Sequence, residues 1–340
     1  MPHDTPPGDG AHAAGWFALH VFLSDAAQAD RFLVEWAGPA VRALLHEGHA
    51  RAWFFLRYWE GGPHLRLRLQ GLPDDARQAL LARARDAVRS HLSTRPPRRE
   101  DYYRHHFFDG QPRDPGELPW YDEGSVLVQP YEPEWRRYGG PQGLPVNEAL
   151  FDLGSTVALG LIRASPGDVA RRLTLAASLM PLFAAAWAAD IDGVARFLED
   201  YVAYWSASSA QVRDFAAVAA PGTAPTPAQC ALLQRQLRSA RDRPAPTARD
   251  AATLLAAGLE GAVAQWTSLR ERGLLVSPVT GRPVADDADH RRSLQAMLAS
   301  QLHMFNNRLG LAPLQEVALA RGLARTARAL ACQDAEALAA

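Results

Sequence analysis

Residues 64–69 read HLRLRL, an alternation that constrains the fold of this chain more than any other short stretch. Side chains of a β-strand point alternately to its two faces, so the leucines lie on one face and His64, Arg66 and Arg68 on the other. The leucine face can be buried against a core. The basic face then meets water, an acidic partner or an anionic ligand, and this choice largely decides the function.

The sequence around this strand predicts a small sheet with helices between its strands. A turn containing Gly-Gly-Pro joins the strand to an upstream one, and an amphipathic helix follows it. A longer helix, bent or split at Pro39, connects the first two strands. The predicted strands are residues 16–23, 52–59, 64–71 and 124–130, and the helices between them are residues 24–48 and 73–92. This β-α-β-β-α-β order is ferredoxin-like.

From about residue 147 the pattern is helical almost throughout. We predict helices at residues 147–164, 167–188, 191–207, 246–271, 286–308 and 313–333, with linkers rich in Pro, Ala and Thr at residues 219–229 and 241–250. The fold class is therefore α+β, an N-terminal ferredoxin-like sheet packed against a C-terminal helical bundle. We expect a disordered tail (1–14) and a single domain (15–335) with an α/β half (15–145) and a helical half (146–335).

Composition excludes several function classes. A formal net charge of −1 argues against a broad nucleic-acid-binding surface. The chain has no lysine, which excludes Schiff-base, P-loop and general-base lysines. The two cysteines, Cys230 and Cys332, lack metal-ligand spacing, so neither a disulfide framework nor a zinc site is expected. The N-terminus lacks the apolar region of a signal peptide, and the apolar segment 173–189 contains Pro181, so we expect a cytoplasmic protein with no membrane partner.

Arg66 and Arg68 lie about 6.5–7 Å apart along the predicted strand, a spacing suited to one or two carboxylates bound through bidentate hydrogen bonds. If Trp53, Phe55 and Arg57 share the basic face, the result is an arginine-rich floor with aromatic walls. Covering that face completely would cost several kcal/mol for each unpaired guanidinium, whereas a cleft with an anionic ligand avoids the cost. Ion pairs with internal Asp or Glu residues explain the same pattern.

The sequence YEPEWRRYGGP, residues 131–141, predicts a stiff loop that leaves the fourth strand. Tyr131 opens the loop, and its arginines, Arg136 and Arg137, are adjacent and need not point the same way. The loop either presents an arginine to a ligand or is a rigid connector whose glutamates pair with its arginines.

In QLHMFNNRLGL, residues 301–311, His303 and Asn307 share one face of a predicted helix because they stand at i and i+4. Histidine is the side chain best suited to accept and return a proton near neutral pH. The alternative is a partly buried histidine at a contact between helices.

The long polar loop at residues 101–124 contains the adjacent His105 and His106. No further metal ligand stands at a useful spacing, so we expect no metal here. Long polar loops are often functional, and this one either contacts substrate or is a surface excursion anchored by Trp120 and Tyr121.

The order of these motifs, WFFLRYWEGGPHLRLRL, then YEPEWRRYGGP, then LHMFNNRL near the end, resembles the SpaB-type C-terminal domain of lantibiotic dehydratases. This domain is also called the thiopeptide-type bacteriocin biosynthesis domain, and the resemblance extends from about residue 16 to about residue 330. It implies an enzyme that modifies a ribosomally synthesised precursor peptide, consisting of leader and core. The large glutamylation domain is not recognisable here, so the chain resembles the stand-alone members.

The resemblance also implies site residues. The family's eliminating site uses arginines of the HLRLR strand, an arginine of the YExExxRYGG loop and the histidine of the HMxxNR helix, which correspond to Arg66, Arg68, Arg137 and His303. We assign substrate binding to the neighbouring residues His64, Arg57, Asn307 and Tyr131. Neither a metal nor an organic cofactor is expected.

Stand-alone members of this family divide into two activities. Some eliminate glutamate from glutamylated Ser or Thr, giving dehydroalanine or dehydrobutyrine, as the split partner of a separate tRNA-dependent glutamylation protein. Others are pyridine synthases, which join two dehydroalanines by a formal [4+2] cycloaddition and release the leader peptide. The intact arginine set favours elimination. A third hypothesis is a non-catalytic subunit that binds the leader by β-augmentation; direct nucleic-acid binding is not expected in any of the three.

Overall fold

The computed structural model describes residues 15–104, 114, 116–208, 214, 224–241 and 250–339. The predicted disordered tail (1–14) and the His105–His106 pair lie outside these residues. The chain divides into two compact units. The sheet unit comprises Met1–Trp135 and Gly154–Asp168, and the helical unit comprises Arg136–Leu153 and Val169–Ala340.

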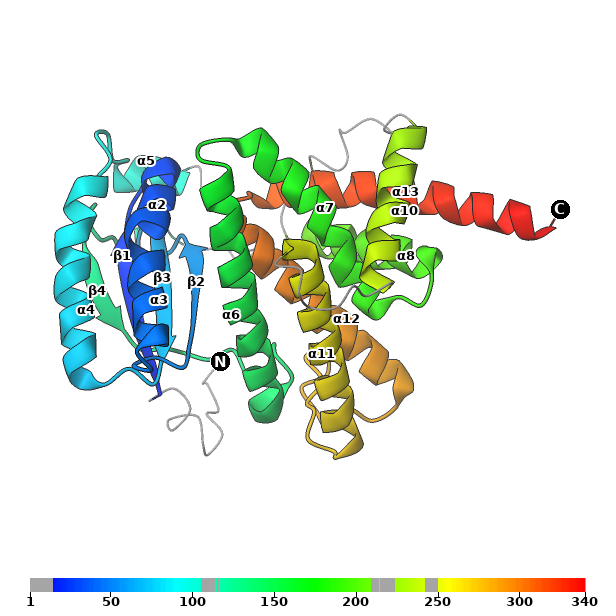
Figure 1. Cartoon of the computed structure of the whole chain (residues 1–340), viewed down its shortest axis with the longest axis horizontal. Coiled ribbons are helices and arrows are strands. Elements are labelled where there is room, and N and C mark those ends of the chain that lie inside the picture. The colour runs from blue at the N-terminus through cyan, green and yellow to red at the C-terminus, as the bar shows by residue number, and fades with distance from the viewer. Residues whose placement is uncertain are drawn as a thin grey trace. The chain divides into compact units, whose positions relative to one another are not determined.

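The sheet unit is built on four antiparallel strands in the order β2-β3-β1-β4 (Figure 1). The strands are β1 (Trp16–Phe22), β2 (Ala52–Tyr58), β3 (His64–Gln70) and β4 (Val126–Gln129). The helical segments α2 (Ala26–Arg31), η1 (Phe32–Ala37) and α3 (Gly38–His46) connect β1 to β2, and α4 (Asp74–Ala87), η2 (Val88–His91) and α5 (Arg99–Arg104) connect β3 to β4. The α+β class is confirmed, whereas the ferredoxin-like assignment stays a prediction.

The helix between β1 and β2 is interrupted where Pro39 predicted a bend. Segment η1 is a π-helix, and the N–H of Gly38 donates to the carbonyl of Leu33, five residues back. A proline has no N–H to continue the i→i−4 ladder, and the wider turn before it accommodates that loss.

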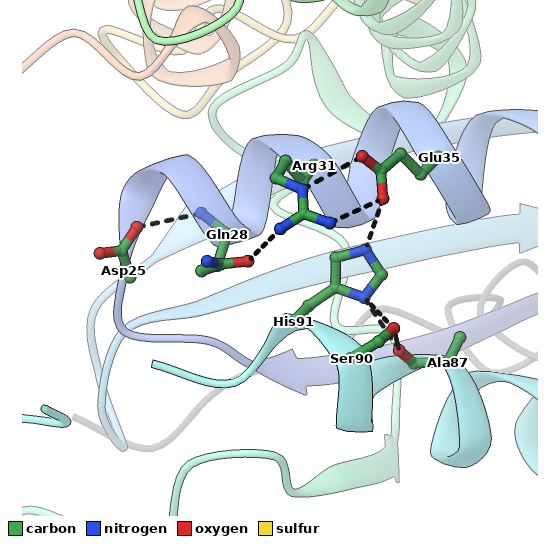
Figure 2. A network of polar contacts seen from close by, with 7 residues as sticks. All are labelled: Asp25, Gln28, Arg31, Glu35, Ala87, Ser90 and His91. Atoms are coloured by element: carbon green, nitrogen blue, oxygen red, sulfur yellow. Dashed lines mark hydrogen bonds and ion pairs between the residues drawn. The ribbon is translucent and has the colours of Figure 1, made fainter. Parts of the chain in front are cut away.

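A polar network ties this helical layer to η2 (Figure 2). Arg31 donates through Nε and Nη2 to the two carboxylate oxygens of Glu35, and Nε2 of His91 lies 3.3 Å from Glu35 Oε2. The hydrogen bond from Arg31 lowers the pKa of the Glu35 carboxyl. Asp25 caps the start of α2 by accepting from the backbone N–H of Gln28.

The leucine face of β3 is buried, as its alternation predicted. Leu65, Leu67 and Leu69 are each no more than 2% exposed. Arg57 of β2 lies opposite Leu65 and therefore on the same face of the sheet. Because Asp30 of α2 forms an ion pair with Arg57, α2 contacts the leucine face (Figure 1).

The expected grouping of Trp53, Phe55 and Arg57 with the basic residues of β3 is wrong. In the β2–β3 register, Tyr58 lies opposite His64, and the three residues lie opposite the leucines. Directly opposed residues share a face of the sheet. Five residues separate Tyr58 from His64, so even-numbered residues of β2 lie opposite even-numbered residues of β3. Tyr58 therefore lies on the basic face, and Arg57 lies on the leucine face.

The helical unit contains α7 (Val169–Trp187), α8 (Ile191–Ser208), α10 (Pro227–Arg241), α11 (Ala251–Glu271), α12 (Asp287–Leu309) and α13 (Pro313–Ala339). Helix α6 (Gly140–Ala164) begins in this unit, and its part from Gly154 belongs to the sheet unit. There, Ser155 accepts a hydrogen bond from the backbone N–H of Phe55 in β2.

Helix α10 was missing from the sequence-based prediction. A capping box marks its start, because Gln229 Oε1 accepts from the N–H of Thr226 and the N–H of Gln229 donates to Thr226 Oγ1. This pattern, Thr-x-x-Gln before a helix, is readable in the sequence. It was masked by the surrounding Pro-, Ala- and Thr-rich residues, which are typical of linkers.

Among the described residues, α7 is the one helix with the length and hydropathy of a membrane span. It packs against α8, α10, α11, α12 and α13, and its buried residues include Arg172. The helix thus packs against other helices of the bundle along its length.

Candidate functional site

Four basic side chains share the face of the sheet opposite the leucines: His20, His64, Arg66 and Arg68. We call this group the basic sheet face. His20 of β1 lies directly opposite Arg66 of β3 in the register, and Arg68 is two residues further along β3. His20 was not among the predicted site residues.

Arg66 is enclosed by aromatic and basic groups. Its guanidinium carbon lies 3.4 Å from the centroid of the Tyr58 ring, and its Nε donates to Nε2 of His64 at 3.1 Å. Within the part of the chain that the structure describes, no carboxylate lies within ion-pair distance of this arginine. Burial is the largest cause that lowers the pKa of Arg66, to about 10, and the charge of Arg68 contributes.

His64 is held in one neutral tautomer. Its Nδ1 lies 2.8 Å from the carbonyl oxygen of Gly62, so Nδ1–H donates there, and Nε2 is left to accept from Arg66. Gly62 supplies this carbonyl from a backbone conformation with φ of 104°, which favours glycine. Burial lowers the pKa of His64 to about 4.

His20 stacks on His64, with ring centroids 4.9 Å apart. Burial, followed by the charge of Arg66, lowers its pKa to about 2. The two histidines are therefore neutral at physiological pH, and the positive charge of this face comes from its arginines.

Arg68 and Tyr131 lie together at the other end of the basic sheet face. The guanidinium carbon of Arg68 is 4.5 Å from the centroid of the Tyr131 ring and 5.2 Å from that of Phe54. Trp16 packs edge-on against both rings. The structure thus brings Tyr131 beside Arg68, whereas Arg57 is paired with Asp30 on the opposite face.

Trp120 and Tyr121 close the end of the sheet near His64. Trp120 packs against Tyr103, whose hydroxyl donates to the carbonyl of Pro119 and accepts from the N–H of Gly61. A small cleft of about 220 Å³ opens beside Tyr121, with Phe22, Pro63, Pro96 and Pro97 in its walls. Tyr121 and Phe22 are in contact, with centroids 4.9 Å apart, and Phe22 in turn contacts His64.

Arg137 is positioned by α12 in the helical unit. Its Nε donates to Ser300 Oγ at 2.7 Å, and Ser300 in turn donates to the hydroxyl of Tyr138. Asn147, fully buried, holds this loop by donating to the carbonyl of Tyr138 and accepting from Gln301 of α12. Arg136 is exposed, so the neighbouring arginines indeed differ in environment.

His303 lies on α12, three residues beyond Ser300 and therefore about one turn along the same face. Its Nδ1 is 3.2 Å from both carboxylate oxygens of Glu316 in α13. The Trp205 ring packs against the imidazole with centroids 4.7 Å apart. Asn307 is partly buried one turn further along α12. The structure thus places Arg137 against the turn of α12 that precedes His303.

The sequence reasoning missed Glu316 and also Tyr201, whose hydroxyl donates to the Glu316 carboxylate. Glu316 stands in the first turn of α13, where an acidic residue is ordinarily explained by the helix dipole. Tyr201 is one aromatic residue within the apolar pattern of α8. A separation of more than a hundred residues lies between them, so no local pattern links the two.

The two groups differ in what they can do chemically. The basic sheet face presents guanidinium groups in a partly desolvated aromatic setting, which favours binding of anions such as carboxylates. The His303 group presents an imidazole backed by a carboxylate, which suits proton transfer. Among the described residues, no three His, Cys, Asp or Glu side chains gather as a metal site.

Comparison with known proteins agrees with the motifs. A family profile described as the C-terminal region of lantibiotic biosynthesis dehydratases matches residues 16–327. The crystal structure of TsrL is 18% identical over 92% of this chain and 93% of its own, with a TM-score of 0.62. The pyridine synthase TbtD from thiomuracin biosynthesis is 16% identical over 92% of this chain and 97% of its own, with a TM-score of 0.66.

The tRNA-dependent lantibiotic dehydratase MibB from Microbispora sp. 107891 is 22% identical, with a TM-score of 0.54, over 96% of this chain and 28% of MibB. No curated protein sequence matches this chain significantly. At these identities the solved structures establish the shared fold, while the family profile covers most of the chain. The chain therefore belongs to the C-terminal family of lantibiotic biosynthesis dehydratases, whose members act in the modification of ribosomally synthesised peptides.

Proposed function

We propose that this chain eliminates glutamate from glutamylated Ser and Thr residues of a precursor peptide, leaving dehydroalanine or dehydrobutyrine. It acts in the cytoplasm without a cofactor, on peptide that a separate tRNA-dependent protein has glutamylated. One observation carries the proposal. Arg66 is held against Tyr58 on the basic sheet face, and burial lowers the pKa of its guanidinium. None of the described carboxylates lies at ion-pair distance, and Glu60 and Glu132 act on Arg66 from further away.

The chemistry of elimination explains why such an arginine is useful. A base removes the Cα proton of the modified residue, the Cβ–O bond breaks, and glutamate leaves with a newly formed carboxylate. Glutamate also carries a second carboxylate, free from the start. Arg66 and Arg68 stand two residues apart on one face of β3. They can bind the free carboxylate of glutamate before the reaction and stabilise the charge of the leaving carboxylate as the Cβ–O bond breaks.

His64 supports this role because its neutral Nε2 orients Arg66. An imidazole that accepts from Nε leaves the terminal N–H groups of the guanidinium for a ligand. Tyr131 and Phe54 serve Arg68 in a similar way, as apolar walls that keep water from its flanks.

In the helical unit, His303 is the proton carrier of the proposal. Imidazole accepts and returns protons near neutral pH, and a Glu316 carboxylate oxygen lies 3.2 Å from Nδ1 of His303. Arg137, positioned by Ser300 on the preceding turn, stabilises negative charge that develops on the peptide carbonyl when the Cα proton leaves. Asn307 is a substrate-binding candidate on the same helix.

The test is intact mass spectrometry of the cognate precursor peptide, glutamylated in advance on Ser or Thr. We expect the wild-type protein to convert glutamylated peptide to the dehydrated form with release of glutamate. Arg66→Gln is expected to slow this conversion about 10²–10³-fold, the loss typical of one electrostatic contact to a transition state.

A surface arginine provides the matched control. Arg89→Gln removes the same charge from a side chain that is 77% exposed, and it is expected to leave the rate unchanged. Circular dichroism verifies that Arg66→Gln is folded, and Arg66→Lys tests whether charge without bidentate geometry suffices. Equal rates for wild-type protein and a folded Arg66→Gln variant would remove Arg66 from the mechanism.

A pyridine synthase is the second candidate, because the pyridine synthase TbtD shares the fold of this chain at a TM-score of 0.66. The same assay distinguishes the two. With a peptide that already carries two dehydroalanines, cyclisation with loss of the leader would support the synthase. If neither peptide changes but leader binding is retained, a non-catalytic scaffold is favoured.

A further inference from the structure

The carboxylate of Glu316 is the most completely enclosed charged group beside a candidate catalytic residue. Its side chain has no exposed surface, whereas that of His303 is 18% exposed. The imidazole is therefore the part of this cluster that solvent or a ligand reaches.

Three donors from two other helices converge on this carboxylate. The Tyr201 hydroxyl of α8 donates to Oε2 at 2.5 Å, and Asn306 Nδ2 of α12 donates to the same oxygen at 3.2 Å. Nδ1 of His303 lies 3.2 Å from each oxygen. Burial raises the pKa of Tyr201 well above its ordinary value, so its hydroxyl keeps the proton that it donates. A buried carboxylate with this many donors is fixed in place.

This geometry selects the tautomer of His303. A carboxylate that faces Nδ1 accepts a proton from that nitrogen, so Nδ1 carries the hydrogen and Nε2 is the basic atom of the neutral ring. The Trp205 ring packs against the imidazole and limits its rotation. The nitrogen available to a reacting group is then always the same one.

We propose that Glu316 is a positioning residue that fixes His303 as the Nδ1–H tautomer, with Tyr201 and Asn306 holding the carboxylate in place. The inference rests on the proposed function only in taking His303 as the proton carrier. The tautomer itself follows from the contacts in the helical unit.

Nitrogen NMR of protein labelled with ¹⁵N-histidine measures the tautomer directly, and His303→Gln identifies the signal. For the neutral wild-type ring we expect Nδ1 to be protonated and Nε2 to be bare. Glu316→Gln is expected to shift the ring toward a mixture of tautomers, because an amide presents either an acceptor or a donor to Nδ1. Glu199→Gln, an exposed change on α8, is expected to leave the signal unchanged.

Turnover of glutamylated peptide provides the second readout. Glu316→Gln is expected to lower kcat about 10–100-fold with little change in KM, by analogy with the loss seen when the outer partner of a metal-bound histidine is removed. Glu316→Asp, which retains a carboxylate, should recover part of that loss. Tyr201→Phe removes one donor that holds the carboxylate but leaves the Glu316–His303 contact, so it should shift the ring toward a mixture of tautomers less than Glu316→Gln does.

The outcomes separate this inference from the proposed function. A Glu316→Gln variant with wild-type nitrogen shifts at His303 overturns the positioning role, whatever the turnover. A changed tautomer in that variant supports the positioning role even if wild-type protein leaves glutamylated peptide intact, and then only the elimination proposal fails. If Glu316→Gln does not fold, the wild-type protein and Glu316→Asp decide. A bare Nδ1 in the neutral wild-type ring overturns the inference, whereas a protonated Nδ1 that folded Glu316→Asp retains supports it.

Discussion

The two histidines of the basic sheet face should make the fold sensitive to mild acid. His20 and His64 are 8% and 3% exposed, and their pKa values fall from 6.5 to about 2 and about 4. Below pH 6.5 the unfolded chain binds two protons that the folded sheet does not. The free energy of unfolding therefore falls as the pH decreases from 6.5, until His64 itself is protonated near pH 4.

The magnitude follows from the same values. At pH 5.5, one unit below the unfolded pKa, each histidine costs RT ln 11, about 1.4 kcal/mol, so the pair costs about 3 kcal/mol. At pH 7.5 the same expression gives about 0.1 kcal/mol for the pair. Carboxylates and other histidines add their own pH dependence, which variants of these two residues retain.

Urea unfolding at pH 7.5, 6.5 and 5.5 measures this difference. The double variant His20→Phe/His64→Gln, which retains an aromatic ring and an amide, should lose about 3 kcal/mol less than wild type between pH 7.5 and 5.5. His46→Gln, an exposed change on α3, should follow the wild-type curve. Identical pH dependence in the double variant and wild type would refute the reasoning, because both histidines would then titrate normally in the folded sheet.

The remaining predictions concern stability at pH 7.5 and are tested by urea unfolding. Gly140→Ala should lower the free energy of unfolding by about 1–3 kcal/mol, because Gly140 has φ of 81° and an added Cβ would lie 2.6 Å from the Val276 side chain. Gly160→Ala, in open space within α6, should raise the free energy of unfolding, and the reverse ranking would contradict this account. Asp30→Asn should cost about 3 kcal/mol by removing the carboxylate from Arg57; adding Arg57→Gln should recover part of that loss, and strict additivity would argue against the pair. Asn147→Ala should lower the free energy of unfolding by about 2–3 kcal/mol, because the side-chain amide of Asn147 donates hydrogen bonds to two backbone carbonyls. A loss below about 0.5 kcal/mol would oppose its role in holding the loop.

The alternation of HLRLRL was sufficient to predict a strand with one apolar and one basic face. Side-chain direction in a strand has a period of two residues, a local property that needs no partner. The membership of the basic face was not predictable in the same way. Tyr58 replaced the expected Arg57 because the register between β2 and β3 depends on how the connecting turn closes.

For the site residues of the helical unit, too, local spacing predicted one part and helix packing decided the other. The i, i+4 spacing in the sequence places His303 and Asn307 on one face of a helix, and the helix forms there. Its partners, Glu316 and Tyr201, belong to α13 and α8. Only the packing of these helices decides that a carboxylate faces Nδ1.

The sequence by itself thus determined the α+β class, the two-faced strand, most helices and the family. These depend on short-range periodicity and on motifs, which are written along the chain. The tertiary structure alone decided that His20 joins the arginines, that Arg57 leaves them, and that Glu316 backs His303. Each of these depends on register or helix packing, where distant residues meet because burial of apolar faces brings their elements together.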